Sequence, residues 1–156
     1  MSLENLQAEL VTTFSGNFVA YYRTHVAHVN ITGPNFYSDH KLLQKIYEYF
    51  QDNIDTIAEK LRTVKTKMPA DIATVTLESP IMDFPTVGNC YDLLTQVDEA
   101  IEAMIEQYHA LNDAAEECNY IDISNFAQDQ ISQLAKFRWM IEATTEETSE
   151  EDERDY

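Results

Sequence analysis

Two long stretches of the chain repeat apolar residues at steps of three and four without a proline. They run from Leu3 to Val29 and from Phe36 to Arg62, separated by a Gly-Pro break at residues 30–35. Because 3.6 residues make one helical turn, this spacing lines the apolar side chains along one face of a helix. It predicts two amphipathic helices of about seven turns each. The first has an apolar face made of Leu3, Leu6, Leu10, Phe14, Phe18, Tyr21 and Tyr22.

The second half of the chain predicts two further helices after a long connection. Residues 63–85 hold three of the four prolines and no sustained period, so they predict a crossover, with a short helix around residues 69–75. The helical period returns over residues 87–118 and 122–143, and Asp122 with Ser124 is the candidate N-cap of the last helix. Two helical hairpins joined by a long crossover describe an all-α four-helix bundle of the ferritin-like kind. We expect one such domain over residues 1–143 and an acidic, disordered tail over residues 144–156.

The charge of the chain limits its partners. With 28 acidic and 10 basic residues, the formal net charge is −18. Such a surface repels phosphate backbones, and no Lys-rich arm precedes the first basic residue, Arg23, so DNA binding is not expected. No run of about 18 apolar residues occurs, and the N-terminus has neither a basic leader nor an apolar export segment. We therefore expect a cytoplasmic protein without a membrane anchor.

The two cysteines, Cys90 and Cys118, lie near opposite ends of the predicted third helix. At 1.5 Å per residue they would be about 40 Å apart. A disulfide between them is excluded if this helix is continuous. Buried thiols in a reducing compartment are the expected state.

Two pairs of side chains could carry metal chemistry. His28 and His40 lie twelve residues apart on either side of the Gly-Pro turn, and His28 projects onto the apolar face of the first helix. Asp55 and Glu59 lie four residues apart in the second helix, which makes them neighbours on one face. Taken alone, a histidine on an apolar face is more often a packed core residue, and a carboxylate pair is more often a solvated surface.

Geometry prevents one chain from joining the two pairs. His40 and Asp55 are fifteen residues apart in one helix, which separates them by roughly 22 Å. If two chains pack their second helices antiparallel about a twofold axis, the histidines of one chain meet the carboxylates of the other at two equivalent sites. Mixed imidazole and carboxylate ligands suit iron, manganese or zinc better than calcium.

The run from His28 to Arg62 resembles the signature of the Dps proteins, the mini-ferritins. That signature reads approximately His-Trp-Asn-Val-x-Gly-x-x-Phe-x-x-x-His, followed by Asp-x-x-Ala-Glu-Arg. The family uses the spacings of twelve, fifteen and four that separate His28, His40, Asp55 and Glu59 here. Residues 135–143 are also similar to the closing helix of the family, so the resemblance extends from about residue 6 to residue 143.

The resemblance implies a hollow dodecamer of four-helix bundles with ferroxidase sites between twofold-related subunits. Such a protein oxidises Fe(II), typically with hydrogen peroxide and otherwise with dioxygen, and stores the ferric product inside. By this resemblance, His28 and His40 of one subunit would bind iron together with Asp55 and Glu59 of the neighbouring subunit. Zinc and manganese are the other metals expected in the same site.

Two departures from the family pattern affect this site. Val29 stands where the family commonly has Trp, and Gln44 stands where it commonly has an acidic residue. Gln44 offers only a neutral amide oxygen, so we expect the second iron position to bind more weakly or to depend on other donors. The further candidate ligands are Glu48, Asp52 and His25.

An acidic ion-entry pore is placed by the family at the start of the fourth helix. The candidate residues for that pore are Glu116, Asp122 and Asp129. Two other functions stay open. One is a protein that protects DNA by coating it, against which the acidic charge argues. The other is a catalytically weak shell protein in which Gln44 marks a site for another divalent metal.

Overall fold

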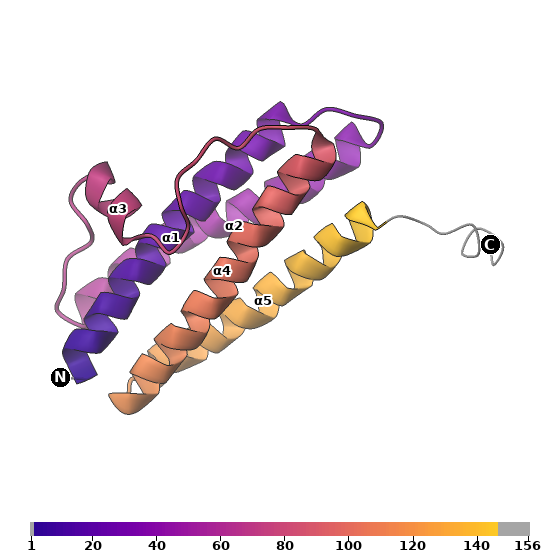
Figure 1. The fold of residues 1–156 in the computed structure, drawn as a ribbon. Coiled ribbons are helices and arrows are strands. Elements are labelled where there is room, and N and C mark those ends of the chain that lie inside the picture. Colours follow the sequence, from indigo (N-terminus) through magenta and orange to yellow (C-terminus); the bar gives the residue numbers. More distant parts are fainter. Residues whose placement is uncertain (1, 147–156) are drawn as a thin grey trace.

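The computed structural model describes residues 2–146, and these form five helices. The helices are α1 (Ser2–Asn30), α2 (Phe36–Thr63), α3 (Ile72–Glu78), α4 (Cys90–Glu117) and α5 (Ile121–Thr145). Helices α1 and α2 are antiparallel, as are α4 and α5, while the crossover with α3 passes along the outside of α1 and makes α4 run in the same direction as α2 (Figure 1). The predicted all-α bundle with a helix in its crossover is confirmed. Most of the acidic segment 144–156 lies outside the described residues.

The core of the bundle lies where the apolar faces of the long helices meet. Helix α1 packs against both α2 and α4, and α4 packs against α5. Apart from Ile31 in the α1–α2 turn, the largest fully buried side chains come from α1, α2 and α4, and they include Leu6, Leu10, Phe14, Leu43, Phe50, Ile57, Ile101, Met104 and Tyr108. Between α2 and α5, the hydroxyl of Tyr49 donates a hydrogen bond of 2.6 Å to Oε1 of Gln130. These contacts place α2 between α1 and α5.

The α1–α2 turn lies at the same end of the bundle as the start of α4 (Figure 1). Gly33 adopts a φ of +130°, a conformation that side chains with a Cβ rarely take. A Cβ at this position would lie 3.4 Å from Sγ of Cys90. The turn is therefore short and packed, and it holds the end of α1 beside the start of α2.

Helix starts differ from the sequence prediction where local caps decide them. Helix α4 begins at Cys90 instead of residue 87, because Gly88 has a φ of +126° and Asn89 caps the helix. The side chain of Asn89 accepts a hydrogen bond of 2.9 Å from the backbone of Asp92, whose carboxylate accepts one of 3.0 Å in return. Helix α3 begins at Ile72, after its cap Asp71, a few residues later than predicted.

The predicted N-cap of the last helix is wrong. Tyr120 occupies the cap position and Asp122 lies within the first turn of α5. The hydroxyl of Ser124 instead donates a 2.7 Å hydrogen bond to Oδ1 of Asn112 on α4. This hydrogen bond holds the start of α5 against α4, and no side chain caps α5.

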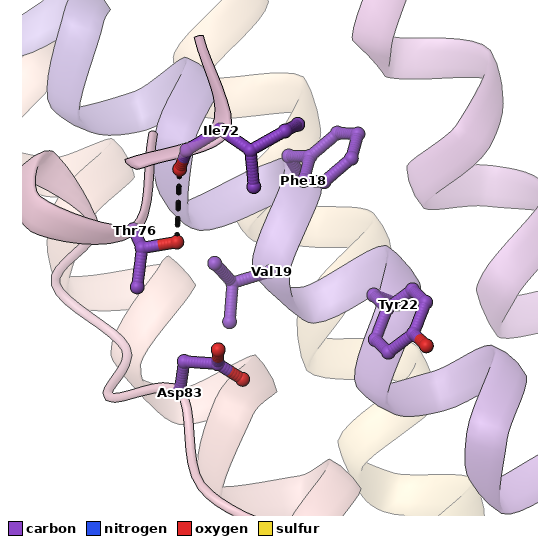
Figure 2. Close-up of a pocket in the computed structure, with 6 residues that line it drawn as sticks. All are labelled: Phe18, Val19, Tyr22, Ile72, Thr76 and Asp83. Carbon is purple, nitrogen blue, oxygen red and sulfur yellow. Dashed lines mark hydrogen bonds between the residues drawn. The ribbon is translucent and has the colours of Figure 1, made fainter. Parts of the chain in front are cut away.

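The outer face of α1 is more open than the apolar spacing predicts. Tyr22, expected in the core, is 61% exposed. It lines an apolar cavity of about 350 Å³ between α1, α3 and the crossover, together with Phe18, Val19, Ile72, Thr76 and Asp83 (Figure 2). The extended crossover covers α1 less completely than a fifth long helix would, so this position stays at the surface.

Two further expectations concern the cysteines and the membrane. Cys90 and Cys118 are both free thiols, and each is partly buried. Within residues 2–146, we find no helix with the length and apolar character needed to span a bilayer.

Candidate metal centre

His28 and His40 meet across the α1–α2 turn. His28 lies in the last turn of α1 and is only 7% exposed, while His40 lies in the second turn of α2. Their rings stack with centroids 3.8 Å apart and planes inclined by 16°. The prediction that His28 points inward and converges with His40 is confirmed. The short turn makes this possible because it leaves no room for the two helix ends to separate.

Reciprocal hydrogen bonds hold the two imidazoles. Nδ1 of His28 donates to the backbone carbonyl of His40 at 2.8 Å, and Nδ1 of His40 donates to the carbonyl of His28 at 2.8 Å. A carbonyl can only accept, so the proton of each ring resides on Nδ1, and the lone pair of the neutral ring is on Nε2. Anchoring one ring nitrogen in this way orients the other as a metal ligand. The structure therefore offers two Nε2 donors side by side.

The surroundings of His28 favour the neutral form of its imidazole. Burial lowers the pKa of His28 below its ordinary value, and the neighbouring His40 and His25 lower it further. The hydrogen bond to the His40 backbone and the negative charge of Glu48 oppose these effects without reversing them. Since only a neutral imidazole binds a metal, this environment favours coordination at neutral pH.

Gln44 and Glu48 follow His40 along the same face of α2 at steps of four residues. The amide nitrogen of Gln44 donates a hydrogen bond of 2.9 Å to Oε1 of Glu48. The amide oxygen of Gln44 can still accept a hydrogen bond or bind a cation, and Glu48 is exposed. Asp52, one turn further on, is exposed.

Asp55 and Glu59 are exposed on the second half of α2. This helix is continuous from Phe36 to Thr63, so Asp55 lies roughly 22 Å along the axis from His40. No cluster of three or more His, Cys, Asp or Glu residues suited to a metal ion occurs within residues 2–146. The chain thus brings the two histidines together and keeps the two carboxylates at a distance from them.

His25 belongs to an aromatic cluster that the sequence analysis missed. Its ring stacks on that of Tyr47 with centroids 4.3 Å apart and planes inclined by 2°. Its Nδ1 lies 3.1 Å from the hydroxyl of Tyr21. Tyr47 in turn lies 4.9 Å from the ring of His28. The apolar spacing assigned Tyr21 to the core, although its four-residue step to His25 is a signal of side-chain contact.

The three pore candidates lie away from the histidines. Glu116 is near the end of α4, Asp122 is in the first turn of α5, and Asp129 follows two turns later; all three are exposed. The α4–α5 turn is at the opposite end of the bundle from the α1–α2 turn (Figure 1). Val29, at the position where Dps proteins commonly have Trp, is 62% exposed.

The chain is similar to known proteins over most of its length. Residues 7–150 match the ferritin-like domain family. A DNA protection during starvation protein of Brevibacillus brevis is 25% identical over 146 residues, which span 93% of this chain and 98% of that protein.

Solved structures share the fold at low sequence identity. A Dps protein from Vibrio cholerae, described as a member of a broad superfamily of ferritin-like diiron-carboxylate proteins, has a TM-score of 0.87 at 21% identity, covering 93% of this chain and 91% of that one. A dodecameric thioferritin from Bacteroides fragilis has a TM-score of 0.84 at 15% identity, covering 90% and 84%. These likenesses establish the ferritin-like fold.

Proposed function

The chain belongs to the ferritin-like family and, within it, to the Dps proteins, and on this premise we propose that it oxidises Fe(II) with hydrogen peroxide at sites shared between subunits. Membership of this family supports a mini-ferritin role in iron storage. The ferric product would be held inside a hollow homo-oligomeric shell. A dodecamer is the proposed assembly, as in the thioferritin from Bacteroides fragilis.

The observation that carries the proposal is the anchored histidine pair. Two neutral rings, each tied through Nδ1, present two Nε2 donors at one place. Asp55 and Glu59 are exposed on a rigid helix and can serve a second chain that packs antiparallel to the first. Imidazole and carboxylate together form a donor set that suits iron.

Each ligand type has a role in the oxidation. The histidines would bind Fe(II) as neutral donors, and the carboxylates of the neighbouring subunit would favour Fe(III), whose higher charge they neutralise better. Two Fe(II) ions supply the two electrons that convert one hydrogen peroxide and two protons into two waters. Peroxide is then consumed without release of a hydroxyl radical. Ferric product would collect on acidic surfaces, for which the net charge of −18 is favourable.

Gln44 makes the second iron position the weaker one in this proposal. Its amide oxygen carries no charge, and its amide nitrogen already binds Glu48. Glu48 is therefore the nearest replacement carboxylate on this face, with Asp52 a turn further on. His25 is a poorer candidate, because Tyr21 and Tyr47 already hold its ring. We also propose that iron enters past Glu116, Asp122 and Asp129 at the α4–α5 end.

The experiment that tests this function is a stopped-flow record of Fe(II) oxidation at two irons per chain. Peroxide and dioxygen are supplied separately, to the wild type, Asp55→Ala and the control Asp113→Ala, which removes an exposed carboxylate from α4. We expect rapid peroxide-dependent oxidation in the wild type and the control, and a loss of about tenfold or more in Asp55→Ala. Equal slow rates in all three proteins would contradict the proposal.

A catalytically weak shell that binds zinc or manganese is the alternative that Gln44 favours. Under this alternative, His28→Ala would leave the rate of Fe(II) oxidation unchanged while abolishing zinc binding in a calorimetric titration. Coating of DNA is disfavoured by the charge of −18, and a gel-shift assay at low salt should show no retardation.

A further inference from the structure

Arg23 is a buried arginine whose charge has no partner. It lies on α1 and is only 4% exposed. Nε and Nη2 of its guanidinium group are buried and have no hydrogen-bond partner among residues 2–146. The ion pairs formed within these residues all belong to Arg138, so no carboxylate there pairs with Arg23. Because burial of an unpaired charge is costly, this guanidinium group indicates a site for an anion.

Two carboxylates lie near Arg23 without neutralising it. Burial lowers the pKa of Arg23, and the negative charges of Glu99 and Asp83 oppose this shift without reversing it. The group still keeps its proton, as arginine does in proteins. Cζ of Arg23 lies over the ring of Phe84, 4.0 Å from the ring centroid. This cation–π contact holds the guanidinium group in place but supplies no acceptor for its N–H groups.

Arg23 lines a cavity between the second half of α1 and the crossover. This Arg23 cavity has a volume of about 470 Å³, and its walls are Tyr22, Arg23, Val26 and Asn30 of α1 and residues 83–87 of the crossover. Asn30 and Val87 are exposed, so the cavity opens at the surface. A ligand can therefore enter beside Arg23 from the solvent.

The apolar cavity of Figure 2 adjoins the Arg23 cavity. Tyr22 and Asp83 line both of them. The apolar cavity, of about 350 Å³, has Phe18, Val19 and Ile72 among its walls (Figure 2). Ligand sites in proteins are typically apolar with a few placed polar groups. The two cavities together have this character, because one is lined by hydrocarbon and the other contains a fixed positive charge.

We propose that the two cavities bind a free fatty acid, whose carboxylate pairs with Arg23 and whose chain passes Tyr22 into the apolar cavity. A carboxylate accepts hydrogen bonds from two N–H groups of an arginine at once. The hydrocarbon chain removes the apolar walls from water. An inorganic anion would leave those walls uncovered and would gain nothing against the repulsion of a net charge of −18. Asp83, which lines both cavities, disfavours a head group with a second negative charge.

This site is separate from the candidate metal centre. Arg23 and His28 are five residues apart on α1, which turns their side chains to different faces of the helix. His28 stacks on His40 of α2, whereas Arg23 lies over Phe84 of the crossover. The inference therefore does not rest on the proposed function, and its failure would leave the iron chemistry standing.

The test is a calorimetric titration of the intact protein with octanoate, decanoate and dodecanoate, each below its micelle concentration. Decanol, which lacks the charge, and acetate, which lacks the chain, are titrated as controls. We expect one fatty acid per chain and binding that tightens about threefold to fourfold for each further buried methylene group. Decanol should bind about tenfold or more weakly than decanoate, and acetate should give no measurable binding.

Two variants test the two cavities separately. Arg23→Met removes the charge and should weaken dodecanoate binding by about tenfold or more. The matched control Arg138→Met, which removes a partly exposed arginine of α5, should bind dodecanoate as the wild type does. Ile72→Trp narrows the apolar cavity from a position that is 64% exposed, so it should weaken the binding of dodecanoate more than that of octanoate. Circular dichroism confirms that each variant folds.

Equal binding of dodecanoate to Arg23→Met and the wild type would overturn the pairing with Arg23. An unchanged dependence on chain length in Ile72→Trp would overturn the placement of the chain. Absence of dodecanoate binding to the intact wild type would overturn the site, as expected if a neighbouring chain fills the cavities. Retention of the wild type, but not of Arg23→Met, on phosphatidylglycerol vesicles without binding of free dodecanoate would assign the cavities to a membrane lipid and overturn the free fatty acid.

Discussion

Mixing two inactive variants should restore iron oxidation to about a quarter of the wild-type rate, if the site is shared by a twofold pair. His28→Ala removes one of the paired imidazoles, and Asp55→Ala removes the carboxylate that lies on the far half of α2. His28 stacks on His40 near the start of α2, and this helix runs without a break to Thr63, so His28 and Asp55 of one chain lie far apart. Each site must then combine His28 of one chain with Asp55 of another.

The expected fraction follows from counting sites in each kind of pair. Random pairing of equal amounts makes about half of the pairs mixed. In a mixed pair, one site receives both intact residues and the other receives neither. About half of the sites in half of the pairs are therefore restored, which is about a quarter in total. A site built from one chain would give no restoration, because every chain carries one defect.

The assay refolds the two variants together and measures the initial rate of ferric absorbance after peroxide is added. Mass spectrometry of the intact assembly confirms that both chains are present. Each variant refolded alone, and the two mixed after folding, serve as controls and should stay inactive. Mixed assemblies without restored oxidation would refute the shared site, and so would a rate well above a quarter.

Two further predictions concern stability. Gly16→Ala should lower the urea midpoint, because its Cβ would lie 2.7 Å from Sδ of Met104 and 2.8 Å from Cδ of Pro80; overpacking costs about 1–3 kcal/mol, against about 1 kcal/mol gained in helix propensity. Gly16→Ala should cost less in a Met104→Ala background than in the wild type, although Met104→Ala is itself destabilising because Met104 is fully buried. A rise in the midpoint of Gly16→Ala would contradict the packing argument. For pH, burial lowers the pKa of His28 in the folded chain, so below the ordinary histidine value of 6.5 the unfolded chain binds a proton more readily. The free energy of unfolding should therefore fall as the pH drops below that value, and it should fall less in His28→Phe. Urea titrations between neutral pH and about pH 5 measure this dependence. An equal dependence of the free energy of unfolding on pH in both proteins would refute this role of His28.

The sequence predicted the helices because their signals are local. Apolar spacing, scarce glycine and the Gly-Pro turn act within a few residues of where they stand, and the four long helices lie where these signals placed them. Helix starts were less accurate, since a cap depends on one side chain reaching one backbone group. Asn89 and Asp92 form such a cap for α4, whereas Ser124 bonds to Asn112 on another helix instead of capping α5.

Exposure was the property that spacing predicted least well. Tyr22 stands at the helical spacing of the apolar face, yet the crossover leaves its side chain at the surface beside a cavity. A helical projection describes one helix, and it contains no information on how fully a neighbour covers each face.

Some features of the candidate site also follow from the sequence, and others only from the tertiary structure. The sequence by itself determined which residue types can bind a metal and that twelve residues across a turn can bring His28 and His40 together. Only the tertiary structure decided which ring nitrogens are free, through the reciprocal bonds to backbone carbonyls, and that Tyr21 and Tyr47 lie beside the site. The physical reason is that hydrogen bonding and stacking depend on the position and rotation of α1 relative to α2. The order of residues in either helix does not specify that relation, and packing of the whole bundle does.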